Sequence, residues 1–169
     1  YNPYPYRFRP DAFAADLQEK YKELEPGADT EDRVTVAGRA MAVRNNGMFI
    51  DIKDISGKIQ AFCHKNHLSE EDIERLKCLD VGDMVGISGY VRRTPRGELS
   101  IAAEKFDIIS KSLQPLPEKF HGLTDVDARY RQRYVDFIMN EDSKEIYRKR
   151  CQITSAVRRW FEENGFLEV

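Results

Sequence analysis

The sequence lacks any long run of apolar residues. No stretch reaches the roughly eighteen consecutive apolar residues that a membrane-spanning helix needs. The first ten residues, YNPYPYRFRP, contain no apolar core of the kind found in secretory signal peptides. We therefore expect a cytoplasmic protein that has no membrane partner.

Cysteine is also scarce, and its few positions exclude a disulfide framework. Cys63, Cys78 and Cys151 are odd in number and far apart. Cys63 has His64 and His67 nearby, but no second Cys or His pair follows at zinc-finger spacing. The sequence predicts structural thiols and no metal site.

An excess of charge of one sign is missing as well. The 169 residues include 27 Lys and Arg and 29 Asp and Glu, a formal net charge of -2. A uniformly basic surface is therefore excluded, and any polyanion must bind a local patch. The 41% hydrophobic content suffices for one core plus an appendage. The absent initiator Met and a last strand that begins only at Phe166 predict a piece of a longer chain.

Residues 1–30 form a predicted N-terminal extension that ends in a helix. Asp11 is expected to cap this helix, and Pro26-Gly27 to end it. Its apolar stripe consists of Phe13, Leu17, Tyr21 and Leu24. The helix either packs as a lid on the next domain or adds phosphate contacts through Arg7, Arg9 and Lys20.

Strict alternation of apolar and polar residues from 48 to 63 predicts a β-hairpin. The inner face is expected to hold Met48, Ile50, Ile52, Ile59, Ala61 and Cys63. The outer face is expected to hold Phe49, Asp51, Lys53, Lys58, Gln60 and Phe62. An aromatic ring among amides and cations suits an unpaired base.

Residues 31–112 continue this pattern into a small barrel. A strand over 33–44 faces inward with Val34, Val36, Ala40 and Ala42, has a bend or close approach at Gly38, and ends at the turn Asn45-Asn46-Gly47. A helix capped by Ser69 follows, and two further strands continue to about residue 110, with a bulge near Glu104. Three strands, a helix and two strands predict a five-stranded OB-fold Greek-key barrel.

Such barrels bind ligands on strands two and three, between the first and the last hairpin loops. Phe49, Gln60, Glu98 and Arg44 lie on these elements. The predicted phosphate contacts are Arg92, Arg93, Arg96 and Lys58. Each residue also has a structural explanation: Phe49 can pack under the N-terminal helix, Gln60 can be a solvated strand residue, and the arginines can protect a sheet edge.

Residues 113–123, with two prolines and a glycine, are a predicted linker, and 124–169 are predicted to be helical. Thr124 is expected to cap one helix that carries the ion pairs Asp125–Arg129 and Asp127–Arg131. A further helix is predicted from Ser143 to a stop at Gly165. Its apolar side holds Ile146, Ile153, Val157, Trp160 and Phe161.

Several strings together resemble the class II lysyl-tRNA synthetases. The most specific is LPEKFHGLTDVDARYRQRYVDFIMN at 116–140, and VAGR at 36–39, KIQ at 58–60, GELS at 97–100 and RRWFEENGFLEV at 158–169 support it. Aspartyl and asparaginyl relatives share the barrel but usually not RYRQRY. The resemblance implies an anticodon-binding barrel followed by the start of an α+β catalytic domain, and it covers essentially the whole chain.

The resemblance also implies roles for particular residues. A Phe of the family stacks on the central uracil of a U-rich anticodon with a Gln and a Glu nearby, and these roles match Phe49, Gln60 and Glu98. Arg39 and Arg44 resemble further anticodon contacts. The last helix resembles the family's homodimer interface, which gives Ile153, Val157, Trp160 and Phe161 as interface residues. By resemblance, the intact homodimeric enzyme attaches lysine to lysine tRNA with ATP and Mg²⁺, while this chain has no catalytic residue or cofactor of its own.

Three alternatives remain open at this point. The barrel can belong to an aspartyl- or asparaginyl-tRNA synthetase. It can be a general single-strand binder, which needs several stacking aromatics along the groove, whereas here Phe49 is the well-placed ring and Phe62 and Tyr90 are the further candidates. The C-terminal helices can instead form a protein-interaction surface around Val157 and Phe161.

Overall fold

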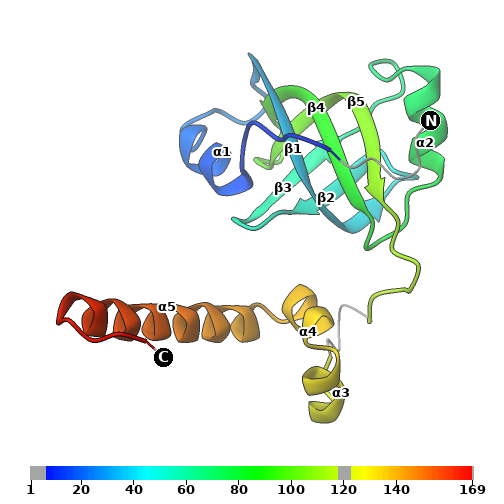
Figure 1. The fold of residues 1–169 in the computed structure, drawn as a ribbon. Helices are drawn as coiled ribbons and strands as arrows, with labels where there is room; N and C mark the ends of the chain where they lie inside the picture. The colour runs from blue at the N-terminus through cyan, green and yellow to red at the C-terminus, as the bar shows by residue number, and fades with distance from the viewer. Residues whose placement is uncertain (1–6, 118–122, 169) are drawn as a thin grey trace. The chain divides into compact units, whose positions relative to one another are not determined.

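The computed structural model describes residues 7–117 and 123–168 and divides the chain into two compact units. The first unit is Tyr1–Pro115 and the second is Leu116–Val169 (Figure 1). The predicted linker lies partly in residues 118–122, outside the described residues. No described helix is both long enough and apolar enough to cross a membrane.

The first unit is a closed five-stranded barrel, as predicted. Its strands are β1 (Asp29–Arg44), β2 (Phe49–Lys53), β3 (Lys58–Phe62), β4 (Met84–Arg93) and β5 (Leu99–Ser110). They pair around the barrel in the order β1-β2-β3-β5-β4, and β4 closes back on β1. Only β3 and β5 pair in parallel, while the other neighbours are antiparallel. β1 begins four residues earlier than the predicted strand start at Arg33.

The barrel interior is filled by the alternating residues that the sequence predicted for the hairpin and for β4 and β5. The fully enclosed side chains include Ile50, Ile52, Ile59, Ala61, Val85, Ile87, Val91, Leu99, Ile101, Ala103 and Phe106. Burial of such aliphatic and aromatic side chains is the main favourable contribution to folding. The barrel core thus involves all five strands.

Four register shifts in the described strands and one glycine adjust the barrel. Ser88 pairs with Lys105 while Gly89 pairs with Ala103, so Glu104 is the extra residue and the predicted bulge is confirmed. A second bulge between Ala40 and Ala42 was not predicted, and it leaves Ala42 only half-buried. At Gly38, an added Cβ would lie 2.6 Å from the carbonyl oxygen of Lys53, which confirms the expected close approach.

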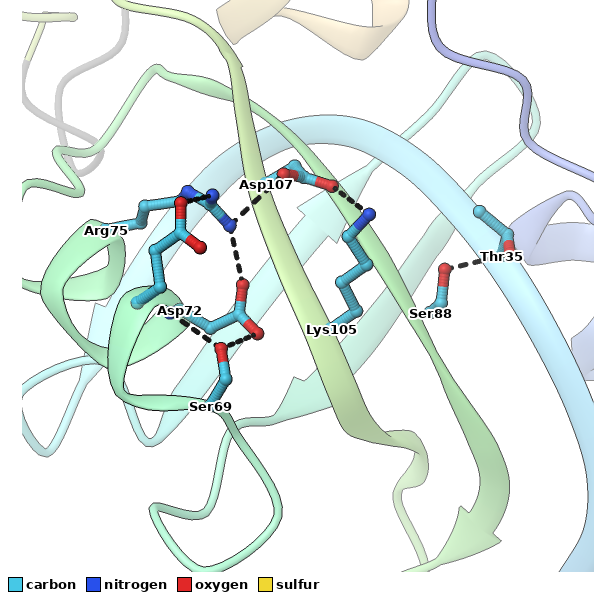
Figure 2. A network of polar contacts seen from close by, with 8 residues as sticks. Thr35, Ser69, Asp72, Arg75, Ser88, Lys105 and Asp107 are labelled. Carbon is cyan, nitrogen blue, oxygen red and sulfur yellow. Dashed lines mark hydrogen bonds and ion pairs between the residues drawn. The ribbon is translucent and has the colours of Figure 1, made fainter. Parts of the chain in front are cut away.

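Helix α2 (Glu70–Lys77) lies between β3 and β4 in the sequence and packs against β5. The Ser69 hydroxyl accepts a hydrogen bond from the Asp72 amide at 3.1 Å, so Ser69 caps the helix as predicted. Arg75 Nη1 then lies 2.8 Å from Asp72 Oδ1 and 3.6 Å from Asp107 Oδ1 (Figure 2). Through Arg75, one polar network fixes α2 to β5.

Helix α1 (Ala14–Lys20) corrects the prediction for the N-terminal helix. Asp11 does not cap it: the Asp11 carboxylate accepts a hydrogen bond from the Thr35 amide at 2.7 Å. The turn between β2 and β3 caps the helix instead. Asp54 Oδ2 accepts from the Ala14 amide at 2.7 Å, and Ser56 Oγ accepts from the Ala15 amide at 3.0 Å.

The apolar side of α1 packs on the barrel. Leu17 and Tyr21 are buried, and Leu24 is partly buried against the core. Phe13, which was predicted in the same stripe, is instead 46% exposed. Figure 1 shows α1 and α2 on opposite sides of the barrel.

Among its described residues the second unit has three helices, where two were predicted. They are α3 (Val126–Arg131), α4 (Arg133–Met139) and α5 (Glu141–Glu163), because the predicted first helix breaks at Gln132. Asp125, not Thr124, caps α3 by accepting a hydrogen bond from the Ala128 amide at 2.6 Å. Gly165 has a φ of +82° just beyond α5, as expected for a helix stop. Residues 166–168 form no strand.

A buried carboxylate joins these helices. Asp136 is fully buried and lies 2.9 Å from Arg129 Nε and 3.0 Å from Arg133 Nη1. Asn140 Nδ2 donates to the same carboxylate at 2.6 Å, and Ser143 Oγ lies 3.3 Å from it. Arg129 therefore pairs with Asp136 rather than with Asp125 as predicted.

Candidate functional site

A pocket of about 740 Å³ lies on the outer face of β2 and β3. The β1–β2 turn and the β4–β5 turn border it on its two sides. Its size is within the range of small-molecule and base-binding sites. The lining residues are Arg44, Asn45, Phe49, Gln60, Phe62, Arg92, Thr94, Pro95, Arg96 and Glu98.

Strand register explains why these side chains meet. Phe49 of β2 pairs with Phe62 of β3. Two residues before Phe62 on β3, Gln60 pairs with Ser100 of β5, and Ser100 pairs with Arg92 of β4. Alternate residues of a strand share one face, so these side chains form two adjacent rows on the outside of the barrel.

Phe49 and Phe62 form an aromatic pair on this surface. Their ring centroids are 5.2 Å apart with the planes inclined by 38°. His64 continues the row, with its ring centroid 5.7 Å from that of Phe62, and His67 lies 5.8 Å beyond His64. Both phenylalanine side chains are only half-buried, so they can offer ring surface to a stacked base.

Gln60 and Glu98 supply opposite hydrogen-bonding character to the pocket. Gln60 Oε1 accepts a hydrogen bond from Ser100 Oγ at 2.8 Å, so the amide presents its NH₂ group as a donor. The Glu98 carboxylate is exposed and acts as an acceptor. The turn that carries it is held by the Thr94 amide donating to the Glu98 carbonyl at 2.8 Å and by Gly97 at a φ of +87°.

The three lining arginines differ in their partners. Arg44 is ion-paired with Asp51 across the β1–β2 hairpin. Arg92 Nε lies 3.1 Å from Asp29 Oδ1, and its Cζ lies 5.3 Å from the centroid of the Phe62 ring. Arg96 is exposed at the β4–β5 turn, where a phosphate can approach it.

Three predicted contacts lie outside the pocket lining. Arg93 donates from Nη1 to the Gly97 carbonyl and from Nη2 to the Tyr21 carbonyl, both at 2.7 Å. Arg39 Nη1 donates to the Gly82 carbonyl at 2.6 Å. Lys58 pairs with Lys53 at the opposite end of the hairpin from Phe49.

The cations of the N-terminal segment are also separate from the pocket lining. Lys20 Nζ lies 3.1 Å from Asp32 Oδ2, and hydrogen bonds to Tyr21 and to this carboxylate raise the pKa of Lys20. Arg7 and Arg9 are exposed. Neither residue lines the pocket.

Four lining residues were not among the predicted site residues: Asn45, Phe62, Thr94 and Pro95. Phe62 shares the outward phase of Gln60, and pairing of the hairpin brings it opposite Phe49. That phase was visible in the sequence. Turn residues such as Thr94 and Pro95 carry no periodic signal, so only the folded loop places them at the site.

The cysteine and histidines after β3 do not converge. Cys63 is buried in the barrel core, and this burial raises the pKa of its thiol to about 12. His64 and His67 lie on the outer surface beside Phe62. Among residues 7–117 and 123–168, no cluster of three or more His, Cys, Asp or Glu could hold a metal ion.

Known protein families match both units. Residues 34–109 match the OB-fold nucleic acid binding domain, and residues 125–169 match the class II tRNA synthetases (D, K and N). Over 166 residues, the chain is 50% identical to a lysine–tRNA ligase of Sinorhizobium medicae and 51% identical to that of Rhizobium etli; each match covers 98% of the chain. The chain is similar to class II lysyl-tRNA synthetases over almost all of its length.

The match to this family covers almost all of the chain but only part of the relatives. The lysine–tRNA ligase of Arabidopsis thaliana, described as chloroplastic/mitochondrial, is 46% identical over 173 residues, which is 99% of the chain and 29% of that relative. The two bacterial relatives are each covered to 33%. The chain therefore spans about a third of the length of the lysyl-tRNA synthetases that it matches.

Proposed function

We propose that the barrel binds the anticodon of lysine tRNA as the recognition part of a lysine–tRNA ligase. The observation that carries this proposal is the meeting of Phe49, Gln60 and Glu98 in one pocket, on the face that OB-folds use for oligonucleotides. The lysine–tRNA ligases among the relatives support the choice of tRNA. Separate strands and a turn supply the three side chains, so their convergence depends on the fold.

A uracil fits the chemistry of this pocket. In our proposal its ring stacks on Phe49, and the Gln60 NH₂ group donates to one of its carbonyl oxygens. The Glu98 carboxylate accepts a hydrogen bond from the N3–H group, which distinguishes uracil from cytosine because cytosine N3 carries no hydrogen. Arg44 contacts the anticodon from the β1–β2 turn, and Arg96 holds the backbone at the β4–β5 turn.

The remaining steps belong to the intact protein in this proposal. There, ATP and Mg²⁺ activate lysine in the cytoplasm, and the lysine is then passed to its tRNA. No step of that chemistry is assigned to the described residues of this chain. Their part is to bind the anticodon end of the substrate.

We propose α5 as part of the homodimer interface of the intact protein. Ile153, Val157, Trp160 and Phe161 are 65%, 49%, 57% and 45% exposed. Surface helices with so many exposed apolar side chains commonly pack against a partner. Sedimentation of the intact protein with Val157→Asp should show monomers, whereas an unchanged dimer would contradict this assignment.

The decisive experiment is a titration of this chain with anticodon stem-loops at fixed salt. We expect a UUU loop to bind at least tenfold more tightly than a GUC loop or a scrambled loop, a difference of about 1.4 kcal/mol. A preference for GUC would favour the aspartyl alternative. Equal weak binding of all three loops would contradict lysine-anticodon recognition by the barrel.

Phe49→Ala tests the stacking contact itself. We expect weaker binding of the UUU loop by about 1–3 kcal/mol, the usual value of one base–aromatic stack. Phe13→Ala is the matched control, because Phe13 is 46% exposed and lies outside the pocket lining. Equal affinities of the two variants would remove Phe49 as the platform.

A general single-strand binder is the second candidate function. The row of Phe62, His64 and His67 beyond Phe49 favours it, because binders without sequence preference use several stacking rings. In that case the affinity would rise with the length of an unstructured oligonucleotide and would not depend on its bases. The scrambled loop in the titration separates the two functions.

A further inference from the structure

We propose that Arg92 is a second stacking position, on which a base next to the Phe49-bound base lies. This inference rests on the proposed function and gives the pocket two base subsites rather than one. The sequence placed Arg92 among the phosphate contacts, and its surroundings in the structure indicate a different use.

The Arg92 guanidinium is held between a ring and a carboxylate. Its Cζ lies 5.3 Å from the Phe62 centroid, and its Nε lies 3.1 Å from Asp29 Oδ1. The side chain is only 25% exposed, yet it lines the pocket. An ion pair and a cation–ring contact, made with two different strands, therefore hold the group in place.

Small residues on β5 allow this arrangement. Arg92 of β4 pairs with Ser100 of β5, and Phe62 of β3 pairs with Ala102 of the same strand. Because Ser100 and Ala102 have short side chains, Arg92 can extend over β5 to the Phe62 ring. A bulky residue at either β5 position would separate the two.

A guanidinium in this setting is suited to stacking. Bases stack on Arg planes as they do on aromatic rings, and an ordered plane loses little entropy on binding. The Phe62 ring contacts both positions: its centroid lies 5.2 Å from that of Phe49 and 5.3 Å from Arg92 Cζ. The two proposed stacking positions therefore share one neighbouring ring.

The charge of Arg92 is a weaker argument for a phosphate contact. The Asp29 carboxylate already balances it, so a phosphate would compete with an ion pair that is in place. Arg96, exposed on the β4–β5 turn, is the better phosphate ligand of the two. Replacement by Lys keeps the charge but removes the planar guanidinium group. We therefore expect Arg92→Lys to lose RNA affinity and Arg96→Lys to keep most of it.

The test compares Arg92→Lys and Arg92→Ala with Arg96→Lys and Arg96→Ala in this chain. The probes are the UUU stem-loop and the same RNA with an abasic nucleotide on one side of the central uracil or the other. Thermal unfolding of each variant reports whether its fold is intact. Asp29→Asn is a milder variant, because it removes the ion pair that holds the Arg92 side chain but leaves Arg92 itself unchanged.

We expect both Arg92 variants to weaken binding of the UUU loop by about five- to tenfold, the lower part of the range for one stacked base. With one of the abasic loops, they should bind as the unmodified chain does. Asp29→Asn should follow the same pattern with a smaller loss. Arg96→Ala should weaken all three RNAs alike, and Arg96→Lys should restore most of that affinity.

An Arg92→Lys variant that binds like the unmodified chain would overturn the proposal. An Arg92→Ala loss that persists with both abasic loops would overturn it too, because it would indicate a phosphate contact. If Phe49→Ala weakens binding and the Arg92 variants do not, only the second stacking position fails. If the UUU loop shows no preferred binding to the unmodified chain, the proposed function and this inference fail together.

Discussion

The barrel and the C-terminal helices bury opposite kinds of side chain. In the first unit the buried core is aliphatic and aromatic and reaches from Ala14 to Ile108. Among the described residues of the second unit, the buried side chains are Asp136 and Ser143, and the apolar side of α5 is exposed. The barrel buries its own apolar side chains. The helices pack around a polar centre, and the apolar side of α5 stays available to another surface.

This contrast was not visible in the amphipathic patterns. The stripe of α1 and the stripe of α5 have similar spacing, but Leu17 is 4% exposed and Ile153 is 65% exposed. Periodicity identifies which face of a helix is apolar but does not identify what covers it. The difference supports our assignment of binding to the barrel and of assembly to the helices.

The largest expected effect contrasts a core residue with an α5 residue. Phe106→Ala removes a fully buried ring from the barrel and should lower the free energy of unfolding by about 3–5 kcal/mol. Val157→Ala, at a site that is 49% exposed, should change it by less than about 0.5 kcal/mol. Urea unfolding followed by circular dichroism checks both variants. Equal losses would mean that α5 is covered within the chain.

The next effect concerns the polar centre of the helices. Asp136→Asn should destabilise the second unit by about 2–3 kcal/mol, the upper range for hydrogen bonds to a charged group. Hydrogen exchange of amides in α3 to α5 measures the loss, and amides of the barrel serve as the internal control. A loss that is equal in the two units would contradict their independence.

Acidic pH should likewise destabilise the second unit more than the barrel. Burial of Asp136 raises the pKa of its carboxyl, but hydrogen bonds from Asn140, Arg129 and Ser143 outweigh it and hold this pKa below the ordinary value. The carboxylate therefore stabilises the second unit above the ordinary pKa, and this contribution is lost as the pH falls through the lowered pKa. As the pH falls through this lowered pKa, amide hydrogen exchange in α3 to α5 should accelerate in the unmodified chain but not in Asp136→Asn.

Arg93 and Arg96, three positions apart in the barrel, allow a matched comparison of a stability effect with an RNA-binding effect, and both effects are expected to be smaller than those above. Arg93→Ala removes donors from the carbonyls of Tyr21 and Gly97 and should cost about 1.5–2 kcal/mol of stability. Its RNA affinity, measured on folded protein, should stay unchanged. Arg96→Ala should do the reverse and reduce the salt slope of RNA binding by about 1. Equal changes in stability and in RNA affinity for the two variants would contradict this division of roles.

The smallest effect concerns the cap of α1. Asp54→Ala should destabilise the docked helix by about 1 kcal/mol, a usual value for an N-cap side chain. Asp16→Ala is the control, because Asp16 lies exposed in the first turn of the same helix. Amide exchange across α1 is the measurement. Equal exchange in both variants would remove Asp54 as the cap.

The sequence predicted what local patterns determine. Alternation of apolar and polar residues predicted the inner face of the hairpin. A change in the phase of that alternation in the last strand predicted the bulge at Glu104. Asn45-Asn46-Gly47 predicted the turn, in which all three residues have positive φ. The outward phase of Phe49 and Gln60 also gave the centre of the pocket. Each of these features is encoded within a few neighbouring residues.

Contacts between distant segments were not predictable in this way. The capping of α1 by Asp54 joins residues forty positions apart. Arg93 donates to the Tyr21 carbonyl across a gap of 72 positions, so a side chain predicted to contact phosphate supports the fold instead. The helix break at Gln132 lies between two segments of good helical pattern, and Arg129 and Arg133 on either side of it pair with Asp136 in the folded unit.

The distant cap of α1 has a consequence for the order of events during synthesis. Helix α1 has seven residues, too few to be stable as an isolated helix. Asp54 and Ser56, which satisfy its first amides, leave the ribosome about forty residues later. Helix α1 is therefore translated before the β2–β3 hairpin but gains its cap only after that hairpin has formed, so docking of α1 indicates that the hairpin has closed.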